Sequence, residues 1–512
     1  MSRTKNSTRN IIFSLSSMLV SSILTFVSRT IFIHSLGLNY LGLNGLYSNI
    51  LSFLSIAELG IGNAISFSLY KPLAEKNMEK IASYINLFRK CYLIIGSIIL
   101  VIGLMLTPYL DYFVNFDSSV NINYYSIYFL FLLNTIMPYF LFSYKITVLY
   151  ADQKAYMVSK KDMLYQTLTI LLQLIALVVF KNYYLYLIIG TILISLKNYS
   201  LGRIVEKMYP IVRNTKINKL SSEEIKSLRK NVFSLSLTKI SGVVYSSTDN
   251  IIISAFVSTL TVGLYSNYSM IINMLKGIIA AFFNSFTASI GNLNSEKNSD
   301  KLFDVFKKLN FVNFWLYGYI FIELNCLLNI FISIWVGENA IFSKFNVFLI
   351  CLMFLIPGLN NVINIFKDAC GLYWQTKYRA VATAFVNLIA SLILVQILGI
   401  AGVFLGTIIA YLTTIYIKDP VVVFKECFNR KVIIYYKELF FRASLILVLN
   451  IVADWIIVFL NIYFNGIALF FVSGIVITII VNAVFYILFY RTEEFQFFKN
   501  IILDMIKKII RK

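Results

Sequence analysis

Long apolar runs separated by short polar connections set the pattern of this 512-residue chain. The runs are about 20 to 28 residues long, which is the length that a helix needs to cross the hydrocarbon core of a membrane. The sequence lacks the two-residue alternation typical of membrane barrels. We therefore predict fourteen membrane-spanning helices, at approximately 11–35, 43–70, 88–109, 122–150, 163–180, 183–203, 231–257, 263–290, 309–336, 341–366, 379–398, 401–418, 443–461 and 466–490.

The distribution of lysine and arginine tests this count of spans. Basic residues collect in the cytoplasmic connections of a multi-pass membrane protein, so they should occupy every second connection if each span is real. With both termini placed inside, 38 of the 45 basic residues fall in inside connections, and only Lys181 and Lys344 fall outside. A missed or false span would scramble this partition. We therefore predict that both termini are cytoplasmic.

A repeated motif indicates two related halves. The run 45–49, Gly-Leu-Tyr-Ser-Asn, recurs at 263–267, 218 positions later, and Phe-Arg-Lys at 88–90 is matched at the same offset by Phe-Lys-Lys at 306–308. Between these matches, Glu-Lys-Asn at 75–77 is echoed at 296–298. Internal repeats are typical of secondary transporters, whose substrate site lies between the repeats.

The repeats and the connections together predict five regions. These are an N-terminal lobe of spans 1–6 (1–203), a cytoplasmic linker (204–230), a C-terminal lobe of spans 7–12 (231–424), an interfacial helix with spans 13 and 14 (425–490), and a cytoplasmic amphipathic tail (491–512). In the linker, Ser221 and Glu224 have the spacing of a capping box, which predicts the start of a short helix. The basic and apolar residues at 425–442 and in the tail predict helices lying on an anionic inner leaflet, with solvated connecting charge as the alternative.

The composition excludes several classes of protein. A chain that is 59% hydrophobic and 13% charged cannot hide its apolar surface in one or two soluble cores. The net charge of +21 does not indicate a nucleic-acid partner, because the basic residues lie between the spans. The five cysteines have neither CxxC spacing nor a pairing pattern, so we expect no metal site and no disulfide. No nucleotide-binding, metalloprotease or hydrolase motif is present, so we predict a non-enzyme without a cofactor.

Charged residues within the predicted spans are the candidates for function, because a charge in hydrocarbon is costly and usually faces a polar interior. The cations outnumber the acids there, and this excess favours an anionic substrate. Four of the cations lie close enough to a span end for their side chains to reach the headgroups, which is the alternative reading. The cations are Arg29, Lys145, Lys197, Lys239 and Lys276, and the acids are Glu58, Asp249 and Glu323.

Lys276 is the cation that headgroup contact does not explain. It lies about 20 Å from either end of its predicted span, at 1.5 Å per residue. Glu58 and Glu323 are equally central, and their side chains are too short to escape. Lys276 must therefore face a polar interior, where it either pairs with a glutamate or binds an anion.

Three further signals are weaker. His34, the sole histidine, lies at the predicted outer end of the first span, where an interfacial role is favoured over proton coupling. Lys367–Asp368 and Lys418–Asp419 lie at cytoplasmic helix ends and indicate either local ion pairs or gate contacts.

Several short motifs resemble those of the polysaccharide-transport family, the Wzx-type flippases for O-antigen and capsule repeat units. The motifs are the helix end from Arg29 to Gly37, the turn 41–43, the run Glu58-Leu59-Gly60-Ile61-Gly62, the stretch 69–73, and the second-half runs 247–253 and 262–265. The resemblance covers nearly the whole length. This family belongs to the multidrug/oligosaccharidyl-lipid/polysaccharide exporter (MOP) superfamily.

The resemblance implies an all-α integral membrane protein with 14 transmembrane helices. Two pseudo-symmetric, MATE-like lobes of six helices would enclose a cavity lined by spans 1, 2, 7 and 8, with two further helices at the C-terminus. Such a flippase moves undecaprenyl-diphosphate-linked oligosaccharide across the bacterial cytoplasmic membrane by alternating access. It would act as a monomer in the lipid bilayer, beside the polysaccharide polymerase machinery, and would draw on a proton or sodium gradient.

Site roles follow from the resemblance together with the charges. We predict that Lys276 and Arg29 bind the diphosphate or an acidic sugar, and that Lys145 and Lys239 guide the head group at the cytoplasmic mouth. Glu58, Asp249 and Glu323 are candidates for gating ion pairs or cation coupling. Two alternatives stay open: a cation-coupled drug antiporter of the same superfamily, and a membrane sugar polymerase or transferase.

Overall fold

The computed structural model describes residues 21, 23–58, 61–115, 123–152, 154–213, 220–226, 228, 232, 247–284, 286–296, 298–372 and 374–500. All regular secondary structure in these residues is helical. The chain divides into two compact units, residues 1–266 and residues 267–512.

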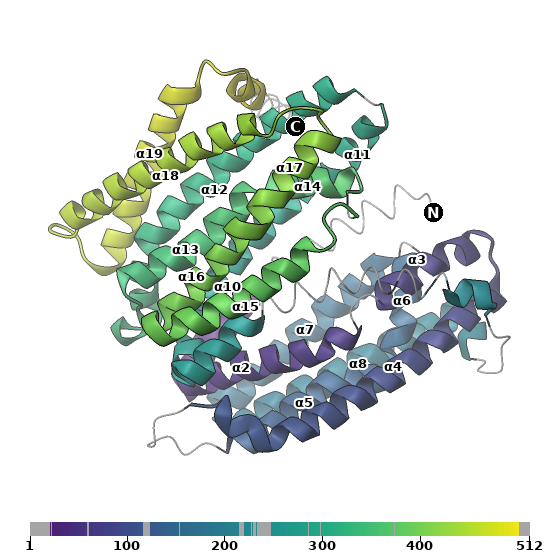
Figure 1. Cartoon of the computed structure of the whole chain (residues 1–512). Helices are drawn as coiled ribbons and strands as arrows, with labels where there is room; N and C mark the ends of the chain where they lie inside the picture. The colour runs from purple at the N-terminus through teal and green to yellow at the C-terminus, as the bar shows by residue number, and fades with distance from the viewer. Residues whose placement is uncertain are drawn as a thin grey trace, which may run out of the picture. The chain divides into compact units, whose positions relative to one another are not determined.

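The first unit begins with the helix Ile23–Leu36, and residues 247–256 are also helical. Its other elements are α2 (Leu38–Leu54), the 3₁₀ turn η1 (Ser55–Glu58), α3 (Ile61–Ala74), α4 (Met78–Leu106), η2 (Thr107–Tyr112), α5 (Tyr124–Phe140), α6 (Ser143–Ala151), α7 (Ala155–Val178), α8 (Tyr183–Met208), η3 (Pro210–Arg213) and the first turns of α10 (Thr259–Asn284). α4 packs on α5, α5 on α8, and α8 on α7 (Figure 1).

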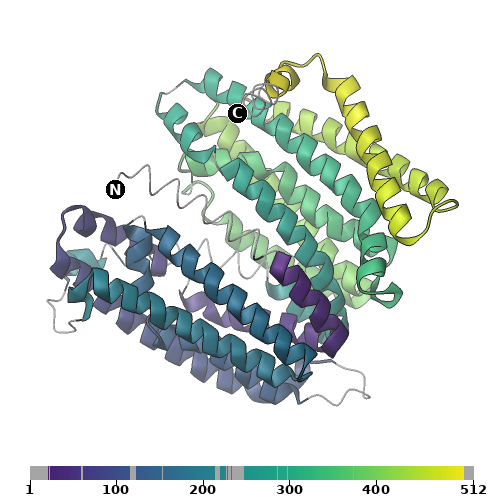
Figure 2. The same ribbon diagram turned by 180° about the vertical axis from the view of Figure 1, so that it is seen from behind.

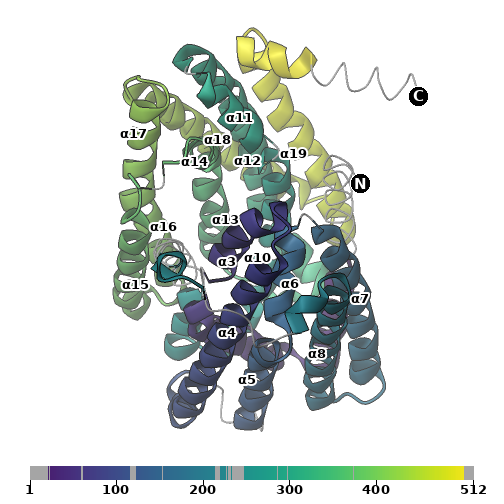
Figure 3. The same ribbon diagram turned by 90° about the vertical axis from the view of Figure 1, so that its right-hand side faces the viewer.

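The second unit holds the rest of α10 and the remaining helices. They are α11 (Thr287–Ser295), α12 (Ser299–Trp335), η4 (Glu338–Ala340), α13 (Lys344–Leu359), α14 (Asn361–Ala369), α15 (Arg379–Leu398), α16 (Ile400–Ala410), the π-helical turn η5 (Tyr411–Ile415), α17 (Tyr416–Glu426), α18 (Ile433–Leu460) and α19 (Gly466–Phe489). The yellow C-terminal helices α18 and α19 both pack on α12 (Figure 2). α14 lies beside α17, and α15 beside α16 (Figure 3).

The helices confirm an all-α membrane fold. In the described residues, ten helices are long and apolar enough to span a membrane, and an eleventh forms if α5 and α6, bent by 56°, count as one. These eleven coincide with predicted spans 3–6 and 8–14. Predicted spans 1 and 7 lie partly outside the described residues. Predicted span 2 is interrupted by η1, so α2 and α3 do not form one continuous helix.

Local capping explains where several of these helices begin. The side chains of Asn77 and Asn298 accept hydrogen bonds from the backbone N–H groups of Lys80 and Lys301, both at 3.0 Å, at the starts of α4 and α12. An N-cap asparagine satisfies a donor that the helix leaves free. The Glu-Lys-Asn repeat seen in the sequence thus performs the same structural task in both halves.

The predicted capping box in the linker is also confirmed. The Ser221 N–H donates to Glu224 Oε2 at 2.9 Å, and the Glu224 N–H donates to Ser221 Oγ at 3.2 Å. Glu224 also binds Lys80 Nζ at 2.8 Å, at the start of α4. The hydrogen bond from Lys80, followed by that from the Ser221 backbone, lowers the pKa of Glu224 below its ordinary value.

Candidate functional site

Arg29 lies on the first described helix and is held by a neutral partner. Its Nη1 donates to Ser266 Oγ at 2.9 Å, while that hydroxyl donates to the Gly263 carbonyl at 2.7 Å. Ser266 belongs to the second copy of the repeated pentapeptide. Arg29 is thus oriented without being neutralised, because a serine hydroxyl carries no charge.

Two adjoining cavities surround this arginine within the first unit. A small cavity of about 110 Å³ includes Arg29 and Asn44 in its lining, and a larger one of about 730 Å³ lies between the first helix, α7 and α8. Thr25, Ser28 and Tyr186 line both cavities. Two neighbouring polar cavities with three shared lining residues therefore lie between the body of α7 and Arg29.

Hydroxyl, amide and charged side chains line the larger cavity. Gln166 Nε2 donates to Ser21 Oγ at 2.5 Å, and Lys197 Nζ pairs with Asp162 Oδ1 at 3.0 Å. The polar contributions come mainly from one stripe of α7, which comprises Ser159, Asp162, Gln166, Thr169 and Gln173. Such groups are suited to binding sugar hydroxyls, and the lone Arg29 is suited to binding a phosphate.

This stripe is not among the residues predicted from the sequence, although the sequence contains its signal. The five positions from 159 to 173 recur at intervals of three and four residues, which places them on one face of a helix. A polar face on an otherwise apolar span indicates a polar interior. A search for formal charges alone does not reveal it.

Glu58 lies at the break between α2 and α3. Its carboxylate accepts hydrogen bonds from Tyr92 on α4 and from Tyr139 on α5, the latter at 2.5 Å. Among the described residues, no lysine or arginine forms an ion pair with Glu58. The predicted gating ion pair is therefore not made in this part of the chain, while cation coupling stays a prediction.

Lys145 is engaged by an acid. It is 4% exposed and pairs with Glu206, whose other oxygen also pairs with Arg203 at 3.3 Å and Arg213 at 3.2 Å. Its Nζ lies 4.2 Å from the centre of the Phe142 ring, at the bend between α5 and α6. Pairing inside the bundle accounts for this cation.

The other predicted residues have varied surroundings. Lys276 on α10 is half-buried, and its Nζ donates to the Met353 carbonyl at 3.4 Å; no described carboxylate pairs with it. Glu323 on α12 accepts from Thr478 Oγ1 at 2.9 Å. Asp249 is buried in the helical stretch 247–256. Lys239 lies outside the described residues.

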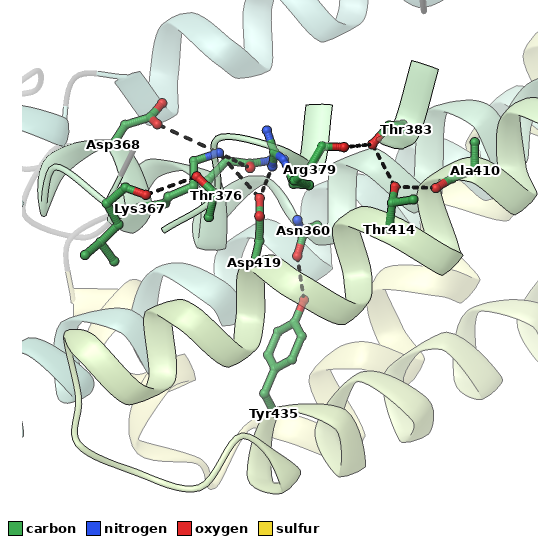
Figure 4. Close-up of polar contacts among 12 residues, drawn as sticks. Asn360, Lys367, Asp368, Thr376, Arg379, Thr383, Ala410, Thr414, Asp419 and Tyr435 are labelled. Carbon is green, nitrogen blue, oxygen red and sulfur yellow. Dashed lines mark hydrogen bonds and ion pairs between the residues drawn. The ribbon is translucent and has the colours of Figure 1, made fainter. Parts of the chain in front are cut away.

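The three charges Lys367, Arg379 and Asp419 form a buried cluster that sequence reasoning placed only in part (Figure 4). Asp419 is fully buried and pairs with Arg379 and, at 3.4 Å, with Lys367. The local contact of Lys367 with Asp368, at 3.9 Å, agrees with the prediction. For Lys418–Asp419, the local ion pair, one of the two predicted alternatives, is not formed among the described residues, because Asp419 joins α17 to α14 and α15 instead. The other alternative, a gate contact, stays a prediction.

The fold matches solved structures of membrane transporters. A structure of the lipid II flippase MurJ in an inward closed conformation aligns with a TM-score of 0.65 over 94% of this chain and 100% of that chain, at 15% identity. An inward-facing multidrug resistance MATE family transporter aligns with a TM-score of 0.59 over 80% of this chain and 96% of that one, at 13% identity. No protein-family model and no curated protein matches the sequence.

A third neighbour concerns the charge of a binding pocket. A MOP superfamily transporter from Pyrococcus furiosus, described as having a binding pocket of reverse polarity, aligns with a TM-score of 0.53 over 84% of this chain and 98% of that one, at 12% identity. The chain is thus a multi-pass membrane protein with the fold of MOP superfamily transporters. The predicted fold class is confirmed.

Proposed function

We propose that this protein is a flippase that moves undecaprenyl-diphosphate-linked oligosaccharide from the inner to the outer leaflet of a bacterial cytoplasmic membrane. Alternating access, without catalysis by the protein, would serve surface polysaccharide synthesis. The observation that carries the proposal is the pair of neighbouring polar cavities in the first unit, the larger lined by hydroxyls and amides and the smaller by Arg29. Hydroxyls and amides can bind the sugar hydroxyls, and the arginine can bind the phosphate.

The balance of charge supports an anionic substrate. Arg29 is bound by a hydroxyl and Lys276 by a backbone carbonyl, and neither partner neutralises its cation. A diphosphate could therefore bind to either without displacing a carboxylate. Lys145 could contact substrate only if its ion pair with Glu206 were broken. The anionic-substrate argument therefore rests on Arg29 and Lys276.

The comparison with a flippase adds support. The MurJ structure covers 94% of this chain, whereas the inward-facing MATE transporter covers 80%. A match that includes the C-terminal helices α18 and α19 would give the larger coverage. The prenyl tail of the proposed substrate can stay in lipid, so that only the head group needs the cavity.

A drug antiporter of the same superfamily is the second candidate. Glu58, bound by two tyrosine hydroxyls at a helix break, is the observation that favours it, because a carboxylate without an ion pair can bind a cationic compound. Discontinuous spans commonly form the substrate and ion sites of transporters. The two candidate functions differ in the charge of the transported substrate, which is negative for the flippase and positive for the antiporter.

Depletion of the protein in its native host tests the proposal. Lipid-linked oligosaccharide should accumulate on the cytoplasmic face, and the wild-type gene should clear it. Arg29→Gln and Lys276→Gln should each fail to clear it at normal membrane levels. Lys301→Gln is the matched control, because Lys301 is 59% exposed and pairs with Glu296 at the start of α12; this variant should clear the lipid.

Absence of such accumulation would contradict the flippase proposal. Export of cationic drugs that requires Glu58, with no change in lipid intermediates, would establish the antiporter instead.

A further inference from the structure

Within the second unit, a line of polar side chains joins α12 to the C-terminal hairpin of α18 and α19. On α12, Trp315 Nε1 donates to Asn482 Oδ1 at 2.8 Å. Tyr319 and Thr478 share a hydrogen bond of 3.0 Å, and Thr478 Oγ1 donates to Glu323 Oε1 at 2.9 Å. We call these residues, with Cys326, Asn450 and Asp454, the hairpin seam.

A second carboxyl group lies further along the seam. Cys326 Sγ donates to Asp454 Oδ1 at 3.6 Å, and Asn450 Nδ2 donates to Asp454 Oδ2 at 3.5 Å. From Trp315 to Cys326 the seam runs about 16 Å along α12, at 1.5 Å per residue. It therefore places two acids from different helices, Glu323 and Asp454, inside membrane-spanning segments.

In the described part of the chain, the hydrogen bonds to Glu323 and Asp454 come from neutral groups. Among the described residues neither Glu323 nor Asp454 forms an ion pair. Lys344 at the start of α13 attracts Asp454 from beyond ion-pair distance. The other titratable groups of the seam are Tyr319, which bonds Thr478, and Cys326, with Cys351 of α13 behind it. Two negative carboxylates in hydrocarbon without a cation would be costly.

The amide of Asn450 indicates what relieves this cost. Asn450 is 4% exposed, and its Oδ1 has no hydrogen-bond partner, although its Nδ2 contacts Asp454. A carboxylate accepts from the amide N–H, while a protonated carboxyl would donate to the amide oxygen after the amide rotates. The Thr478 hydroxyl can likewise donate to Glu323 or accept from it. The seam can therefore satisfy both charge states of its acids.

We propose that Glu323 and Asp454 form a proton-binding site between α12 and the C-terminal hairpin. Uptake of a proton removes one negative charge from the seam, and its release restores the charge and strains the contact between the hairpin and α12. The coupling of this step to substrate movement rests on the proposed function, whereas proton binding does not.

Infrared difference spectroscopy on the purified full-length protein in lipid tests the site without any substrate. Between about pH 6 and pH 9, exposed carboxyls are already ionised, so they contribute little. The wild type should show a carbonyl stretch of a protonated carboxyl that is lost as the pH rises and shifts to lower frequency in heavy water. Glu323→Gln and Asp454→Asn should each remove or halve this band.

Asp304→Asn is the matched control. Asp304 lies on the same helix but pairs with Lys308, so this variant should keep the band. Both test substitutions keep side-chain size and hydrogen bonding, and a monodisperse gel-filtration profile would verify folding. If the band is missing in the wild type, or persists in both test variants, the proton site is overturned. Loss of the band on adding sodium at constant pH would replace it with a sodium site.

The two proposals fail separately. A proton band without accumulation of lipid-linked oligosaccharide would leave the site standing and remove the flippase. Accumulation of lipid-linked oligosaccharide without the proton band would support the flippase and remove the proton site.

Discussion

At the scale of single residues, the partner decides whether a membrane-embedded cation is available to a ligand. Lys145 and Arg29 are both cations of predicted spans. Glu206 neutralises the first, while Ser266 only orients the second. Sequence reasoning treated them alike because the partners lie 61 and 237 positions away.

Removal of the acid from the Lys145 pair should be more damaging than removal of the lysine. Glu206→Gln leaves the buried Lys145 unpaired, which should lower the free energy of unfolding by about 3–5 kcal/mol. Lys145→Met should cost less, because Arg203 and Arg213 remain beside Glu206. Thermal unfolding of the purified variants in detergent would measure the difference. Equal costs for the two variants would show that Lys145 does not depend on Glu206.

At the scale of elements, close backbone approach joins α2 to the first turns of α10. A Cβ placed on Gly42 would lie 2.0 Å from the Thr259 carbonyl oxygen, and one on Gly263 would lie 2.4 Å from the Leu38 carbonyl oxygen. Neither backbone atom can give way without moving its helix. The two glycines therefore permit this helix contact.

Gly42→Ala should force α2 away from α10 and lower the melting temperature. Gly62→Ala on α3 is the control, because its Cβ would meet only the Phe88 ring, at 3.7 Å, an ordinary contact distance. Gly62 is the second residue of α3, so alanine there should leave the melting temperature close to the wild-type value. Of the two variants, only Gly42→Ala should thus shift the melting curve downwards. A wild-type melting temperature for Gly42→Ala would refute the close packing.

The linker helix provides a test that depends on pH. Because the folded-state pKa of Glu224 is lowered, its stabilising contribution is present above the ordinary glutamate pKa and is lost as the pH falls through the folded-state value. Hydrogen exchange at 222–226, corrected for the intrinsic rate, should therefore lose protection on acidification. Glu224→Gln should remove this pH dependence and the exposed Glu223→Gln should keep it. Identical profiles for both variants would exclude Glu224 as the source.

At the scale of the whole molecule, the C-terminal hairpin is tied to the second unit by polar bonds. Trp315 and Glu323 would face lipid in a chain that ends after Lys431. We expect that truncated chain to accumulate at lower levels in membranes, and Glu323→Leu in the same truncation to restore part of the loss. Quantitative blotting of membrane fractions would measure both. Full accumulation of the simple truncation would show that α12 does not need the hairpin.

Features that depend on neighbouring residues were predictable from the sequence. Apolar length and alternating basic connections located eleven of the described spans, and Ser221 with Glu224 located a helix start. Contacts between distant positions were not predictable, because no local pattern records that Asp419 selects Arg379 over Lys418. The candidate site was found only in part: Arg29 was identified from its charge, whereas the polar stripe of α7 was overlooked because four of its five residues are uncharged.

The start of α3, after the break at Glu58, also constrains how the chain can change in length. Two residues lie between the end of η1 and the start of α3, and Ile65 and Leu69 on α3 are fully buried. One residue inserted within α3 between Ile61 and Ile65 would turn both buried positions by about 100° about the helix axis, since an α-helix has 3.6 residues per turn. Both side chains would then leave the core. A frame change at the start of α3 is therefore not tolerable, and alignments of related chains should place their gaps elsewhere.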